Sequence, residues 1–268
     1  MQFPDMPAKS YLGAMCMNNG SIFLCGLEDD RQNLYQLDNG AWKEDSTFVR
    51  NRSTKSIVTT PTAIFTFGGN DTFSDQYSFE YLPKDSTTWV MGKTEIPGGF
   101  TYGIAIAIES GQEIWLIGGD IENKSRILSF NVKNHTFQEL PFGLIVGRSH
   151  HQCAFIPNTN KIMVTGGFDY DSVNLESTEI LNIEDGSVTM ASPMNYKRYA
   201  HGIGVVTING KDRLVAFGGY DGRNELDSVE LYNTETEKWE MTDLKLIEPK
   251  SHFIFLTVKL GDILFNLQ

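Results

Sequence analysis

The chain has 268 residues, of which 40% are hydrophobic. This is typical of one large globular domain or two small ones, and it excludes disordered and fibrous proteins. The formal net charge of −12 argues against nonspecific binding to nucleic acid or to an anionic membrane. No apolar run approaches the ~20 residues that span a bilayer, and the first residues lack the basic and apolar regions of a signal peptide. We therefore expect a cytoplasmic protein, or a secreted one if the chain is a processed fragment.

Along the chain, a short apolar run that ends in a pair of glycines recurs at a nearly constant spacing. The first copy is degenerate and has Cys in place of the first glycine. The five copies are Ile22–Gly26, Ile64–Gly69, Trp115–Gly119, Met163–Gly167 and Val215–Gly219. The first residues of the pairs are 43, 50, 48 and 52 positions apart, so the chain is built from an internal repeat.

A second landmark follows each glycine pair. It consists of two apolar or aromatic residues, the second of which stands seven or eight positions after the first. The five pairs are Tyr35/Trp42, Tyr81/Trp89, Phe130/Phe137, Leu181/Val188 and Tyr232/Trp239. In the clearest copy, 228–239, alternating residues indicate a strand and a polar run indicates a turn. Each unit thus predicts four antiparallel strands: one before the glycine strand, the glycine strand, a Tyr strand and a Trp strand. Repeated four-stranded units are typical of an all-β propeller.

These units resemble kelch repeats, a β-propeller family, over nearly the whole chain and most completely over Arg198–Trp239. The rival propeller family with Gly-His and Trp-Asp signatures fits poorly, since neither dipeptide occurs. Glycine suits a strand whose backbone approaches another closely, and the Trp and Tyr positions can fill the space between adjacent sheets.

Counting the units predicts one domain, 1–268, with six blades. The approximate units are 9–51, 52–98, 99–147, 148–197 and 198–249, with the sixth formed by 250–268 plus 1–8. The sixth blade would be split between the two termini, which would remove an exposed sheet edge. Too few residues precede Phe3 to supply a Tyr strand. The alternatives are therefore five blades, or a chain excised from a longer protein.

A basic residue precedes the first strand of five units, and Gly99 stands in its place in the third unit. These residues are Lys9, Arg52, Arg148, Arg198 and Lys250. Rotational symmetry would place them as a ring on one face, a candidate surface for acidic peptide side chains or a small acid. The alternative is that these residues have a structural role. The resemblance implies it, because kelch repeats commonly carry a basic residue here, and the loops after the glycines offer Asp partners.

Two aromatic residues complete the predicted binding set. Phe168 and Tyr220 follow glycine pairs, and they begin loops that usually lie on the same face in the kelch family. Tyr and Arg are typical hot-spot residues at interfaces. The alternative is that these are turn residues without a ligand. The loop 168–175 is the longest, and we expect it to project.

We predict no catalytic, metal or cofactor site. His150, His151, His201 and His252 stand near one phase of the repeat, which the repeat consensus explains better than metal binding does. Nucleophile and phosphate-loop motifs are absent. The resemblance implies that Glu179 and Glu230 are anchors between strands. Cys16, Cys25 and Cys153 lie in apolar strand contexts, so we expect buried, unreactive thiols.

The resemblance implies a protein-interaction module. Kelch propellers often serve as the substrate-recognition part of a ubiquitin-ligase adaptor or as an actin-associated scaffold. We expect a partner protein or acidic peptide on the loop face, and a monomer, because a closed ring has no need to dimerise. The alternative is a kelch-type enzyme such as a sugar-acid mutarotase.

Overall fold

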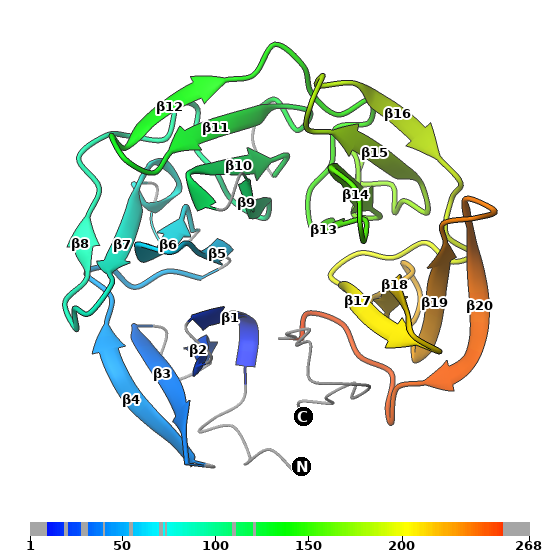
Figure 1. Ribbon diagram of the computed structural model, residues 1–268, viewed down its shortest axis with the longest axis horizontal. Coiled ribbons are helices and arrows are strands. Elements are labelled where there is room, and N and C mark those ends of the chain that lie inside the picture. Colours follow the sequence, from blue (N-terminus) through cyan, green and yellow to red (C-terminus); the bar gives the residue numbers. More distant parts are fainter. Residues whose placement is uncertain are drawn as a thin grey trace.

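The computed structural model describes residues 10–253, except 19–20, 28–31, 40, 54–55, 70–71, 73, 109–110 and 120–121. Within this part, the strands form five four-stranded antiparallel sheets, which are arranged around a common axis (Figure 1). A search of the same residues for a helix of sufficient length and hydropathy to cross a membrane finds none.

The chain completes one sheet, or blade, before it begins the next. Blade 1 consists of β1 (Ser10–Asn18), β2 (Ser21–Leu27), β3 (Asn33–Asp38) and β4 (Ala41–Thr47). Blade 2 consists of β5 (Ser56–Thr59), β6 (Ala63–Phe67), β7 (Phe79–Pro83) and β8 (Val90–Met91), with the short helix η1 (Asp75–Tyr77) before β7. Blade 3 consists of β9 (Ile104–Ile108), β10 (Glu113–Ile117), β11 (Ile127–Asn131) and β12 (Thr136–Glu139). Blade 4 consists of β13 (Gln152–Phe155), β14 (Lys161–Thr165), β15 (Thr178–Asn182) and β16 (Val188–Ala191). Blade 5 consists of β17 (Gly202–Ile208), β18 (Lys211–Phe217), β19 (Ser228–Asn233) and β20 (Lys238–Lys245).

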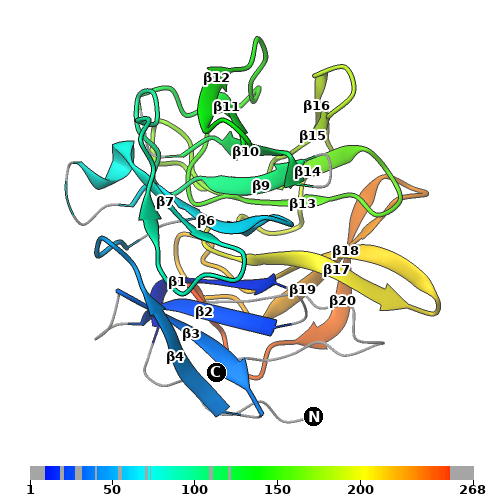
Figure 2. The same ribbon diagram turned by 60° about the vertical axis from the view of Figure 1, so that its left-hand side comes forward.

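In every blade the strands follow sequence order from the axis outwards, with the first strand innermost. The innermost strands of successive blades contact each other: β1 with β5, β5 with β9, β9 with β13, and β13 with β17. Figure 2 shows that each sheet twists from its inner to its outer strand, as antiparallel sheets generally do. The order of strands predicted from the repeat is therefore confirmed.

The prediction of six blades is wrong, because the described residues form five blades in a ring, the number that was the alternative. Each described sheet takes its four strands from one continuous stretch of chain, so none of them needs a strand from the other terminus. The predicted sixth unit, 250–268 plus 1–8, counted two strand-like runs as a blade. Most of it lies outside the described residues, and the described part, 250–253, contains no strand.

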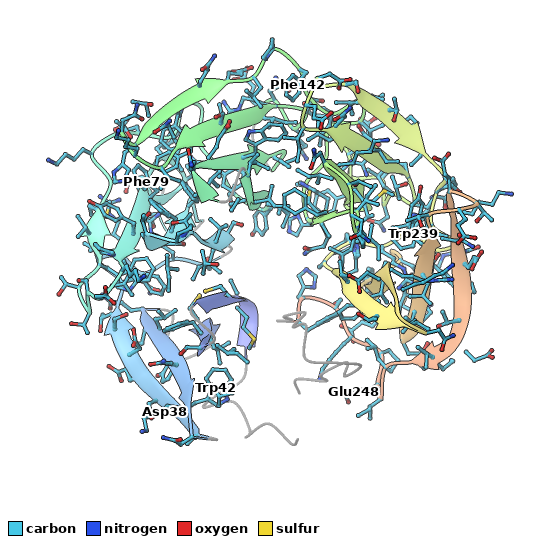
Figure 3. All side chains as sticks on the ribbon, viewed as in Figure 1. Asp38, Trp42, Phe79, Phe142, Trp239 and Glu248 are labelled. Carbon is cyan, nitrogen blue, oxygen red and sulfur yellow. The ribbon has the colours of Figure 1, made fainter. Side chains whose placement is uncertain are left out.

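The hydrophobic core lies between neighbouring blades. One cluster joins blades 1 and 2 through Phe48 and Trp89, whose ring centroids are 4.4 Å apart. Phe79 belongs to the cluster between blades 2 and 3, and Trp239 to the one between blades 4 and 5 (Figure 3). A further cluster joins blades 3 and 4 around Trp115. Each aromatic side chain buries about 150–250 Å² between the sheets, so these clusters supply much of the stability of the propeller.

The glycine pairs join each blade to the segment that follows it. A Cβ atom on Gly166 would lie 2.1 Å from the carbonyl oxygen of Arg198, and Gly166 has φ +59°, a left-handed value. The next residue, Gly167, donates its N–H to the same oxygen at 2.7 Å. Glycine is required here because no side chain fits between these two backbones.

Candidate functional site

The candidate site is the loop face, formed by two kinds of segment. The first kind follows each glycine pair, as in 168–176 and 220–227. The second kind, the inter-blade segment, follows the outermost strand of a blade, as in 140–151, 192–201 and 246–253. The first two of these lead to the innermost strand of the next blade. Isolated bridges pair them, Ser149 with Phe168 and Tyr199 with Tyr220. Loops held this way present their side chains on a stiff frame.

Three of the predicted basic residues, Arg52, Arg148 and Arg198, have fully buried side chains. The guanidinium of Arg198 binds Glu230 with Nη2–Oε1 at 2.9 Å. It also donates to the carbonyl oxygens of Gly218 and Ser228 and to the Ser228 hydroxyl. Arg52 with Glu80 and Arg148 with Glu179 form the same network in their blades. All three guanidinium groups therefore bond to groups inside their own blades. That they bind an anionic ligand remains a prediction.

The glutamates in these networks have a second function. Glu230 accepts the backbone N–H groups of Asn195 and Tyr196, at 2.7 and 3.3 Å. Glu179 and Glu80 bind the corresponding N–H groups of the inter-blade segments before blades 4 and 2. Each carboxylate therefore fixes the course of an inter-blade segment as well as neutralising an arginine. Burial lowers the pKa of Arg198, and the nearby Glu230 opposes this.

The third blade has an apolar pair where blades 2, 4 and 5 have an ion pair. The residue equivalent to Arg148 is Phe100, not Gly99, because its carbonyl accepts from Gly69 as that of Arg148 accepts from Gly119. The residue equivalent to Glu179 is Leu128, which pairs with Leu116 on β10 as Glu179 pairs with Val164 on β14. Phe100 and Leu128 are buried in one cluster. The two partners have therefore been replaced together.

The remaining basic residues differ from the arginines. Lys250 is partly exposed, and its Nζ lies 2.5 Å from the carboxylate of Glu248. The carbonyl of Lys250 accepts a hydrogen bond from the N–H of Gly219, as that of Arg198 accepts from Gly167. Lys250 therefore has the same position relative to blade 5 as Arg198 has relative to blade 4. Lys9 lies outside the described residues.

Both predicted aromatic residues belong to a larger cluster of six half-buried rings from blades 3 to 5, which we call the aromatic surface. Its members are Tyr102, His150, Phe168, Tyr199, Tyr220 and His252. The His150 ring is stacked between Tyr102 and Phe168, with centroid separations of 4.0 and 4.6 Å. Tyr199 lies 5.5 Å from Phe168 and 5.4 Å from Tyr220. Its ring is also 5.5 Å from that of His252. The structure therefore brings Phe168 and Tyr220 together through Tyr199.

Backbone geometry explains how these rings meet. Tyr102, His150, Ala200 and His252 occupy equivalent positions, and all have left-handed φ between 49° and 54°. The N–H of each of the last three donates to the carbonyl of the one before it, at 2.9, 3.0 and 3.0 Å. This ladder between blades holds the aromatic surface. Sequence reasoning missed Tyr102, Tyr199 and the ladder, although the ladder residues are spaced 48, 50 and 52 residues apart.

The four histidines that share one phase of the repeat fall into two groups. His150 and His252 lie on the aromatic surface, whereas His151 and His201 are 1% exposed. Burial lowers the pKa of His151 to about 3, and the charge of Arg148 contributes. Burial likewise lowers the pKa of His201, so both rings are neutral at pH 7. Among the described residues, no group of three or more His, Cys, Asp or Glu side chains could hold a metal ion.

Exposed apolar side chains also occur in the segments that form the loop face. Val49, Ile145 and Ile247 stand three residues before the basic residue of their segments and are 48%, 54% and 81% exposed. Tyr170 and Val173, in the loop predicted to project, are also exposed, as is Tyr196. Large apolar side chains that remain in water on one face are characteristic of interaction sites.

Comparisons with known proteins agree with this architecture. A family model of the Kelch motif matches residues 200–242, which includes blade 5 except for the end of β20. The chain is therefore a β-propeller whose fifth blade matches the kelch repeat. The family predicted from the glycine pairs and the Tyr and Trp positions is therefore confirmed.

The kelch relatives are longer proteins. A RING finger domain and kelch repeat-containing protein of Dictyostelium discoideum is 25% identical over 85% of this chain. Kelch-like protein 23 of Mus musculus is 22% identical over 90% of it. The chain spans 22% and 42% of these two relatives. The solved structure of YjhT superimposes with a TM-score of 0.81 at 13% identity, covering 94% of this chain and 88% of that one, which shows likeness of fold alone.

Proposed function

We propose that this propeller binds a partner protein through its loop face. The observation that carries the proposal is the aromatic surface, because six rings from three blades meet there beside exposed aliphatic side chains. Tyrosine supplies a large contact area at a small cost in conformational entropy, and aromatic residues are enriched among hot spots. The kelch resemblance supports the same role, that of a recognition or scaffold module.

Binding accounts for the loop face better than catalysis does. The carboxylates considered for acid–base chemistry, Glu179 and Glu230, are fully buried and bonded to arginine and backbone N–H groups. A general acid or base must come within hydrogen-bond reach of a substrate. These two groups support a structural role, so we propose that the module is not an enzyme.

The form of the partner follows from the exposed groups. The prediction of an acidic peptide relied on a ring of basic side chains, but three of the arginines are buried. The half-exposed Lys250 is already paired with Glu248. Aromatic and aliphatic groups therefore supply most of the proposed contact area.

Affinity measurements with matched variants test the proposal. A partner is first isolated with the wild-type chain, and its dissociation constant is then measured for Phe168→Ala, Tyr220→Ala and Phe155→Ala. Phe155 is an exposed aromatic residue at the other end of β13, so it serves as the control. We expect the two loop variants to bind at least about tenfold more weakly, which corresponds to 1.4 kcal/mol. Equal affinities for all three variants would show that the partner binds elsewhere.

A further inference from the structure

One loop of the aromatic surface already holds a cation supplied by the chain itself. The Nζ atom of Lys124, from blade 3, lies 5.4 Å from the centroid of Phe168 and 5.7 Å from that of Tyr170. It also donates to the backbone carbonyl of Asp169 at 3.3 Å. An ammonium group within 6 Å of a ring is attracted by the negative charge on the face of the ring. The loop after β14 is thus built around a basic side chain.

The next blade has the same arrangement without the cation. The carbonyl of Lys124 accepts from Arg148, and that of Leu175 accepts from Arg198, so Leu175 occupies the position of Lys124 one blade further on. Tyr220 likewise occupies the position of Phe168, as the matching bridges to Ser149 and Tyr199 show. Within the described part of the chain, no basic group lies over the Tyr220 ring.

The surroundings of Tyr220 are acidic. Glu225 is its bridge partner, and the Glu225 carboxylate accepts from the backbone and hydroxyl of Ser251, beside His252. Asp221 accepts the N–H groups of Arg223 and Asn224. These bonds lower the pKa of Asp221, so it is charged at neutral pH. The neighbouring segment 168–176 carries Asp169, Asp171 and Glu176 and no basic residue. Arg223, in the same loop, is exposed, and its charge also contributes to the lowered pKa of Asp221.

We propose that the partner protein places an arginine or lysine side chain over Tyr220, where Asp221 and Glu225 supply the opposite charge. This inference rests on the proposed function and specifies its chemistry: the recognised segment is basic. The partner's cation takes at blade 5 the place that Lys124 takes at blade 4. A tyrosine face and a carboxylate bind a guanidinium or ammonium group together, and the net charge of −12 attracts a basic segment.

Selection from a random peptide library tests this chemistry without knowledge of the partner. A phage library of random peptides, about twelve residues long, is selected on the immobilised chain at physiological salt. The selected peptides are then synthesised and their dissociation constants measured. We expect enrichment in Arg and Lys. We also expect at least tenfold weaker binding to Tyr220→Leu and to the double variant Asp221→Asn/Glu225→Gln.

A third variant adds a competing cation instead of removing part of the proposed site. Leu175→Lys would place a cation beside Tyr220, as Lys124 lies beside Phe168, and we expect it to weaken binding of the basic peptides by competing for the same ring. The control is Glu235→Gln, which removes a carboxylate from the turn between β19 and β20 at the other end of the blade. It should leave the affinity within about twofold of the wild-type value. Melting temperatures identify any variant that misfolds.

The outcomes separate the two proposals. Acidic or purely apolar peptides that lose affinity for Tyr220→Leu would overturn the basic partner but retain the loop face as the binding site. Basic peptides that bind equally to every variant would show attraction to the overall charge only, which overturns the inference. Failure to enrich any peptide would count against both.

Discussion

Glu230 binds Arg198 and, with the same carboxylate, holds the backbone N–H groups of Asn195 and Tyr196. Glu230, on β19, thereby connects blade 5 to the inter-blade segment that precedes it. Blades 2 and 4 repeat this contact, and blade 3 replaces it with Phe100 and Leu128. Equivalent positions in the blades are thus occupied either by a buried ion pair or by two apolar side chains.

This comparison predicts the cost of breaking the pair. Arg198→Ala should lower the free energy of unfolding by about 3–5 kcal/mol, because it leaves Glu230 charged and buried. The double variant Arg198→Phe/Glu230→Leu copies blade 3 and should recover a large part of that loss. Denaturant unfolding of the wild type and of both variants measures the difference. A double variant less stable than Arg198→Ala would mean that blade 3 tolerates the apolar pair for reasons specific to that blade.

The buried histidines predict a dependence of stability on pH. The pKa of His151 falls from 6.5 in the unfolded chain to about 3 in the folded one. Between these values the unfolded state binds a proton that the folded state does not. Stability is therefore lost as pH falls below 6.5, with a limiting slope of about 1.4 kcal/mol per pH unit. His151→Gln should reduce the slope measured between pH 4 and 6, and an unchanged slope would argue against neutral burial of this ring.

The glycine pairs predict a contrast between two substitutions. Gly166→Ala meets a carbonyl oxygen at 2.1 Å, whereas Gly210→Ala, also at a left-handed φ, meets nothing within 4 Å. Gly210→Ala should cost only the roughly 1–2 kcal/mol of a left-handed alanine. Gly166→Ala should cost a further ~1–3 kcal/mol, because a packed backbone must move. Equal urea midpoints for the two variants would show that the contact between blades yields easily.

The cysteines predict an order of labelling. Cys16 and Cys25 are buried and Cys153 is half-buried, and all three are free thiols. Burial raises the pKa of Cys16 and of Cys153, which keeps the reactive thiolate scarce. A water-soluble thiol reagent should therefore modify Cys153 first and the other two only when the blades open. Labelling of Cys16 in the native protein as fast as in denaturant would contradict its burial.

The fold could be predicted from the sequence because its cause is periodic. Glycines such as Gly166 are required where a blade closely approaches the next segment, and a glycine pair marks four of the five repeats. The number of blades could not be predicted in the same way, since two strand-like runs after Lys250 do not determine how a ring closes. The site was only partly predictable. The spacing located Arg148 and Arg198, and the resemblance implied that Glu179 and Glu230 are anchors between strands. Neither indicated that each arginine is buried and paired with one of these glutamates.

The aromatic surface illustrates the same limit. Phe168 and Tyr220 were found because they follow glycine pairs. Tyr102 stands in the unit that lacks the basic residue, and a ladder of left-handed residues between blades brings it to His150. Such contacts depend on rotation from blade to blade, which a linear repeat does not display.

The central claim, that a partner protein binds the loop face, is tested most directly by amide hydrogen exchange on the chain with and without that partner. We predict slower exchange on binding in 168–176, 195–200 and 220–227, and unchanged exchange in the turns 184–187, 209–210 and 234–237 at the other end of the blades. Protection of those turns, with the loop face unchanged, would contradict the account.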